Sequence, residues 1–71
     1  MWRTNYRNYL AGEEGYSLAE IDWVIGRLEA ELADVPRVSA EIESLLDNLS
    51  YESWMFFHDK FFPRGLVDKA V

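Results

Sequence analysis

Ser17 begins the segment that most restricts how this chain can fold. Ser17 and Glu20 form a capping box, in which the serine oxygen accepts a free helix amide and the glutamate reaches back to the serine amide. Apolar residues then recur at steps of three and four residues as far as Val35, which is the stripe of an amphipathic helix. Pro36 ends the pattern. The sequence therefore predicts a helix over residues 18–33 with one buried face.

The opposite side of this helix carries a second stripe, made of small residues and one tryptophan. Its members are Ala19, Trp23, Gly26, Ala30 and Ala33. Small side chains let another backbone approach closely, so we expect a second contact along this stripe. In a chain of 71 residues the N-terminal segment is the simplest partner, and the seam of a homodimer is the alternative.

Three further helices are predicted around this one. A helix over residues 38–49 follows a short connection, which favours an antiparallel α-hairpin with residues 18–33. Ser50 can cap an aromatic helix over residues 51–61 that Pro63 and Gly65 stop. The alternative is one long helix over residues 38–61 that bends near Ser50.

The first segment is predicted to form a short helix over residues 4–11, with Gly12 as its C-terminal cap. No alternating apolar run flanks a glycine turn, so no strand pair is expected. We therefore expect one all-α domain over residues 1–71. It is a small helical bundle with a central antiparallel α-hairpin, an aromatic C-terminal helix and a short N-terminal helix.

The charge of the chain narrows the class of partner. Thirteen acidic residues against seven basic ones give a net charge of −6, opposite in sign to that of a nucleic-acid binder. An anionic membrane surface would repel the chain, and no apolar stretch is long enough to span a bilayer. The chain lacks cysteine and an apolar N-terminal leader, so we expect a cytoplasmic location. The acids are concentrated in residues 13–59.

The sequence offers little for catalysis or for metal binding. His58 is the single histidine, and it lies in an aromatic helix, where a buried, hydrogen-bonded or surface side chain is the simplest interpretation. Asp59 is adjacent to it on the helix and points elsewhere. A phosphate beside Gly12 and Gly15 would meet two carboxylates. We expect no catalytic residue, no metal site and no cofactor.

The helix over residues 51–61 carries aromatic side chains on nearly every side. A helix that is apolar all round must be buried or must meet a partner, and this domain is small. Aromatic residues and methionine are also enriched at interface hot spots. We predict a partner-binding surface with four anchors. The alternative is that the aromatic helix is buried at the centre of the hydrophobic core. The predicted anchors are Trp54, Met55, Phe56 and Phe62.

Exposed carboxylates of the hairpin would complement a basic partner surface. The predicted residues are Glu31, Asp34, Glu41 and Glu43. We therefore expect a non-catalytic protein–protein interaction module, a small acidic helical inhibitor or adaptor that occupies the surface of a protein. No direct contact with nucleic acid or membrane is expected.

Two alternatives remain open for the function. In size and charge the chain resembles the small acidic proteins that inhibit restriction, repair or CRISPR machinery. That resemblance implies a nucleic-acid mimic of the anti-restriction, anti-CRISPR or phage host-takeover type, in which carboxylates imitate a phosphate backbone. The other alternative is a structural homo-oligomer, in which the aromatic helix or the Trp23 stripe meets a second copy.

Overall fold

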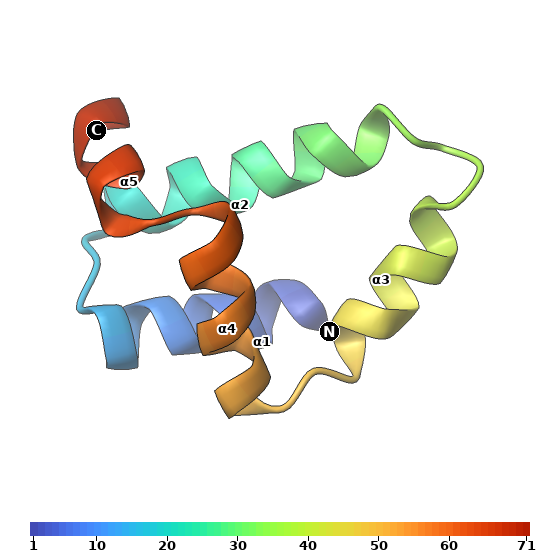
Figure 1. Cartoon of the computed structure of the whole chain (residues 1–71), viewed down its shortest axis with the longest axis horizontal. Coiled ribbons are helices and arrows are strands. Elements are labelled where there is room, and N and C mark those ends of the chain that lie inside the picture. The colour runs from blue at the N-terminus through green and yellow to red at the C-terminus, as the bar shows by residue number, and fades with distance from the viewer.

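The chain folds as a small all-α bundle, as predicted (Figure 1). A computed structural model describes residues 1–71 and contains five α-helices and no strand. The helices are α1 Trp2–Tyr9, α2 Leu18–Ala33, α3 Ser39–Asp47, α4 Tyr51–Phe61 and α5 Arg64–Ala70.

The first helical segment is longer than the predicted residues 4–11. α1 begins at Trp2 and continues into a π-helical segment, Leu10–Glu14. It ends at Gly15, whose φ of +66° lies in the left-handed region that side chains with a Cβ rarely adopt. Gly12 is therefore not the cap. It lies inside the π-helical segment, where an added Cβ would stand 3.0 Å from the Tyr51 hydroxyl oxygen.

Gly15 and Gly26 give a matched pair of substitutions with opposite expected signs. Both are exposed with open space where a Cβ would stand, and only Gly15 has a positive φ. Gly15→Ala is expected to lower the free energy of unfolding by about 1 to 2 kcal/mol, because an L side chain is strained there. Gly26→Ala is expected to raise it by about 0.8 kcal/mol, because alanine favours the interior of α2. Urea unfolding followed by circular dichroism measures both, and equal signs would contradict the assigned backbone conformations.

The capping box that predicted α2 is present. The Ser17 Oγ accepts the Glu20 amide at 3.3 Å, and Glu20 Oε1 accepts the Ser17 amide at 2.8 Å. This second bond holds the pKa of Glu20 below its usual value. The helix buries the predicted apolar stripe in the core. The buried residues are Ile21, Val24, Ile25, Leu28 and Leu32.

The contact predicted between the second stripe of α2 and the N-terminal segment is wrong. Trp23 is half-buried, but the small residues of the stripe are all exposed. α1 instead meets the polar flank of α2 through two ion pairs, Arg3–Glu29 at 2.7 Å and Arg7–Asp22 at 2.5 Å. α1 therefore approaches α2 along the polar flank of α2 and not along its stripe of small residues.

α3 follows α2 after the short connection that favours a hairpin. The two helices contact each other, and α3 runs obliquely to α2 in Figure 1. The chain then breaks at Asn48–Ser50, so residues 38–61 form two helices. Ser50 caps α4, because its hydroxyl accepts the Ser53 amide at 3.1 Å.

α5 is a helix that the sequence analysis missed. Pro63 and Gly65 end α4 in the prediction, but Pro63 also precedes the first turn of a new helix. Proline suits this place, because the first helical amides have no partner within the helix. The Pro63 carbonyl accepts the Leu66 amide at 2.9 Å, and Val67 is fully buried. α5 packs against α2.

α1 is the centre of the packing and contacts α2, α3 and α4. Its Tyr6 ring stacks on Trp54 of α4, with ring centroids 4.3 Å apart. Its first residue, Trp2, donates its backbone amide to Asp47 at 2.6 Å and its indole N–H to Glu43 at 3.0 Å. α4 crosses α1 and packs mainly on it (Figure 1). The side of α4 that carries Phe57 and Phe61 lies beside residues of α2 and α3.

Candidate functional site

Two of the four predicted anchors lie in the core. Trp54 is 1% exposed and Phe62 is 5% exposed. Trp54 packs between Tyr6 and Phe57, and Phe62 meets the Trp23 ring edge to face at 6.2 Å. Trp54 therefore fills the core in this fold and is not available to a partner. Phe62, which directly follows α4, is almost as buried but also lines the groove described below.

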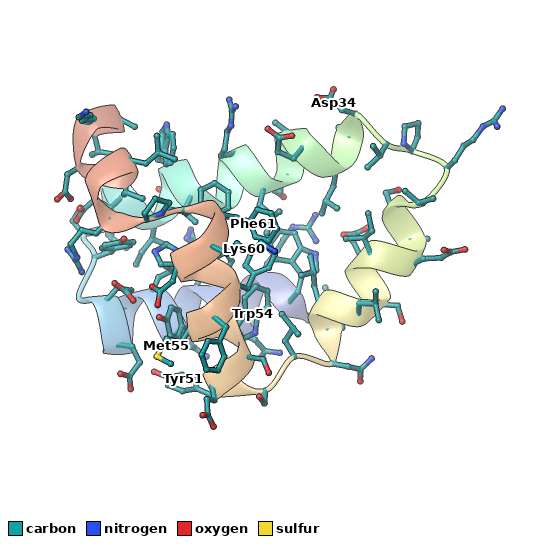
Figure 2. All side chains as sticks on the ribbon, in the orientation of Figure 1. Asp34, Tyr51, Trp54, Met55, Lys60 and Phe61 are labelled. Carbon is teal, nitrogen blue, oxygen red and sulfur yellow. The ribbon has the colours of Figure 1, made fainter.

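The other two predicted anchors are exposed. Met55 and Phe56 lie on α4 with 38% and 62% of their surface accessible. Figure 2 shows Met55 on one side of α4 and Phe61 on the other, towards α2 and α3. The aromatic helix is thus part core and part surface.

The four predicted acids have different surroundings. Glu31 is exposed and is paired with Arg27, one turn earlier, at 3.3 Å. Asp34 and Glu41 are also exposed, and Asp34 lies at the end of α2 (Figure 2). Glu43 is tied to α1, because it accepts the Trp2 indole N–H. Asp34 and Glu41 are therefore the two predicted acids that take part in no ion pair.

The molecule carries an apolar groove on the side of α4 that faces α2 and α3. It has a volume of about 760 Å³ and opens to solvent between α2, α3, α4 and α5. Nine of its eleven lining residues are hydrophobic. They are Trp23, Leu28, Leu32, Val35, Ile42, Phe57, Phe61, Phe62 and Leu66, and the other two are Arg27 and Glu31.

Aromatic side chains of α4 form one wall of the groove. Phe57 and Phe61 lie one turn apart, with ring centroids 5.0 Å from each other. Phe57 also meets the Trp54 ring edge to face at 5.4 Å, which joins the wall to the core. Phe61 stands at the outer edge with 54% of its surface exposed, and Lys60 Nζ lies 5.7 Å from its ring. Figure 2 shows the Lys60 and Phe61 side chains on the side of α4 that faces α2 and α3.

The helices that enclose most of the groove are acidic. α2 carries four acidic residues, α3 three and α4 two. Arg27 and Lys60 are the basic residues of these three helices. The two charged residues that line the groove itself, Arg27 and Glu31, form an ion pair with each other.

His58 forms a second feature, buried behind the groove. It is 1% exposed, and each ring nitrogen meets a tyrosine hydroxyl. Tyr6 lies 2.7 Å from Nδ1 and Tyr16 lies 2.9 Å from Nε2. The ring also stacks against Phe62. Burial lowers the pKa of His58, and this is the strongest influence on it.

The tyrosines around His58 stay protonated at neutral pH. Burial is the main cause that raises the pKa of Tyr6 and of Tyr9, and it raises the pKa of Tyr16 to about 12. The Tyr9 hydroxyl donates to Glu14 at 2.6 Å, which adds to its shift. Arg64 of α5 bonds the Glu14 backbone oxygen and covers the Tyr16 ring at 4.6 Å. The cluster thus fastens α1, α4 and α5 together.

Sequence reasoning placed aromatic side chains on nearly every side of the helix over residues 51–61 but did not assign Phe57 or Phe61 to a site. Phe57 and Phe61 share a helical stripe with Trp54, which is a signal for one face of α4. The sequence could not show that part of this face remains uncovered.

No group of three or more histidine, aspartate or glutamate side chains is placed to hold a metal ion. No helix has both the length and the apolar character needed to cross a bilayer. Comparison with known proteins found no matching family model, no matching curated protein and no matching solved structure.

Proposed function

We propose that this chain is a non-catalytic protein-binding module, a small acidic inhibitor or adaptor, whose groove takes an amphipathic helix of a protein partner. The partner helix would present large apolar residues to the groove and basic residues to its margins. The absence of cysteine favours a cytoplasmic setting for this interaction.

The observation that carries this proposal is the exposed apolar surface of the groove. Val35, Phe61 and Leu66 line it and are each more than 40% exposed. Exposed apolar side chains that gather in one hollow indicate a binding surface, whereas scattered ones do not. Burying one of these side chains against a partner is worth about 1.5 to 3 kcal/mol.

A helix is the occupant that fits this hollow. Helices line the groove on several sides, so no exposed strand edge is offered to an extended peptide. Helix-binding grooves read apolar residues at positions i, i+3 or i+4, and i+7 of their ligand. The acidic surroundings would steer a basic helix towards the groove and would repel an acidic one.

The exposed acids support a second candidate, the nucleic-acid mimic. Asp34 and Glu41 are exposed and have no ion pair, which is the feature that favours it. However, Asp22 and Glu29 are paired with arginines of α1 and offer less charge to a basic cleft. A mimic should lose affinity by about 10³-fold or more between 50 and 200 mM salt. Binding through the groove should change by less than about tenfold over that range.

A displayed random-peptide library, selected on the immobilised full chain, tests the proposed function. We expect the selected peptides to be helical, amphipathic and positively charged. Their binding should shift the amide resonances of Trp23, Phe57, Phe61 and Leu66 in NMR spectra of the protein. Peptides that shift only residues around Met55 and Phe56 would contradict the proposal.

Sedimentation at micromolar concentration is the control for self-association. We expect a monomer. A dimer that dissociates when a groove residue is changed would assign the groove to a second copy of this chain and would overturn the proposed partner.

A further inference from the structure

His58 makes the only buried side-chain hydrogen bonds of the chain, and both join α4 to other segments. One reaches Tyr6 of α1, and the other reaches Tyr16 in the connection before α2. α4 takes part in none of the ion pairs between elements, whereas α1, α2, α3 and α5 all do. The buried hydrogen bonds that hold α4, the wall of the groove, therefore all depend on the titratable ring of His58.

The hydrogen-bond inventory of this bridge fits a neutral imidazole. A neutral ring has one bare nitrogen that accepts a tyrosine O–H, and one N–H that donates to the other tyrosine. A protonated ring has two N–H donors and no acceptor. The tyrosine that had donated to the ring would lose its acceptor inside the core, and an unpaired buried donor is unfavourable. Protonation of His58 would thus leave one tyrosine O–H without an acceptor and would place a positive charge in the core.

We propose that the Tyr6–His58–Tyr16 bridge is an acid-sensitive latch that holds α4 against α1 and so keeps the wall of the groove in place. The effect of this latch on partner binding rests on the proposed function. The response of the free protein to acid does not.

The groups that face His58 do not cancel the cost of its protonation. Burial lowers the pKa of His58, Arg64 acts in the same direction, and Glu14 and Asp59 oppose them. Neither carboxylate is hydrogen-bonded to the ring, whose two nitrogens both meet tyrosines. The charged and titratable groups around it are Tyr6 and Tyr9 from α1, Glu14 from the π-helical segment, Tyr16 from the connection, Arg64 from α5 and Asp59 from α4 itself.

The sign of the pH dependence follows from this lowered pKa. The unfolded chain binds a proton at His58 near pH 6.5, and the folded chain binds it only at lower pH. Stability is therefore complete above pH 6.5 and falls as the pH drops from there towards the folded-state pKa of His58. Ordinary carboxylates titrate near pH 4, so this histidine dominates between pH 6.5 and 5.

Two measurements on the free, full chain test the latch without any partner. Urea unfolding between pH 7.5 and 5 should show the folded-to-unfolded ratio falling by about tenfold, because each pH unit below the unfolded pKa can change it by up to tenfold. Hydrogen-exchange protection factors, which correct for the intrinsic effect of pH, should fall for α4 amides before those of α1 and α2. A flat stability curve, or equal loss of protection in α1, α2 and α4, would overturn the proposal.

His58→Gln is the decisive variant. Its amide has a donating NH2 group and an accepting oxygen in place of the donating and accepting nitrogens of the neutral ring, and it does not titrate. We expect its stability to be unchanged between pH 7.5 and 5, and an acid response equal to that of the wild type would overturn the latch. If this variant does not fold, Tyr16→Phe takes its place. It keeps His58 and removes one hydroxyl, so its α4 amides should already be less protected than those of the wild type at pH 7.5. Unchanged protection there would overturn the latch.

A groove-binding peptide from the selection described above separates the latch from the proposed function. Its affinity should fall by at least threefold from pH 7.5 to 5.5 for the wild type and should not change for His58→Gln. If no peptide binds the groove while α4 loses protection in acid, the latch holds and the proposed function fails. If peptides bind equally at both pH values and α4 protection is constant, the latch fails and the proposed function holds.

Discussion

Trp54→Ala is expected to remove about half of the free energy of unfolding at 25 °C. Replacing a buried tryptophan by alanine costs about 3 to 5 kcal/mol, through lost burial and the cavity that remains. A chain of 71 residues has a total stability of only about 4 to 10 kcal/mol. Trp54 stacks on Tyr6 at 4.3 Å, where α4 crosses α1, so neighbouring side chains cannot readily fill the space. Urea unfolding followed by circular dichroism at 222 nm would measure this loss.

Two variants serve as controls for Trp54→Ala. Trp54→Phe keeps an aromatic ring on Tyr6 and also removes the indole N–H, which is buried with no hydrogen-bond partner. An unpaired buried donor costs about 1 to 3 kcal/mol, so this variant should lose much less stability than the alanine variant. Phe56→Ala changes an exposed ring on the same helix and should alter stability by about 0.5 kcal/mol or less. Similar effects for Trp54→Ala and Phe56→Ala would contradict the position of Trp54 in the core.

Phe61→Asp is expected to weaken binding of a selected groove peptide by about 30-fold or more, the size of an interface hot spot. The substitution removes an apolar ring from the groove wall and places a carboxylate where the partner would exclude water. Phe56→Asp should change the same affinity by less than about threefold, because Phe56 does not line the groove. Isothermal titration calorimetry with the same peptide measures both variants.

These two variants are closely matched. Both replace an exposed phenylalanine of α4 by aspartate, and both add one negative charge. Long-range repulsion or attraction of the peptide is therefore changed almost equally. Circular dichroism must show that both remain folded, since Phe61 also packs on Phe57. An equal loss of binding in the two variants would contradict the groove as the binding site.

The sequence predicted the helices whose ends carry strong local signals. Ser17 and Ser50 cap α2 and α4 as expected, because a serine oxygen bonds amides within its own first turn. α5 was missed because Pro63 both ends one helix and precedes the next, and a proline signal does not distinguish the two roles. Gly15 rather than Gly12 ends the first segment because a π-helical turn, which has no strong sequence signal, continues the helix past Gly12.

The candidate site was harder to predict because it depends on how helices cross. Trp54 and Phe56 are both aromatic and lie two residues apart, yet one is buried and the other is 62% exposed. The high aromatic content of residues 51–61 distinguished this helix from the others, but it could not show which face of the helix would meet α1. The groove exists because α4 packs on α1 and leaves Phe57 and Phe61 beside α2 and α3. Such an arrangement depends on contacts between residues that are distant in the sequence.

The central place of α1 has a consequence for how the protein is made. α1 is synthesised before α2, α3 and α4, which are its packing partners, and its Tyr6 bonds His58, which is 52 residues further along the chain. Until α4 has emerged, Tyr6 lacks both the Trp54 ring on which it stacks and the His58 nitrogen that it bonds, so part of the aromatic face of α1 remains in water. Contacts of such long sequence separation slow folding and prolong the exposure of apolar surface. The chain is therefore expected to fold in one late step, once α4 has been synthesised. A truncated chain that ends before α4 should aggregate.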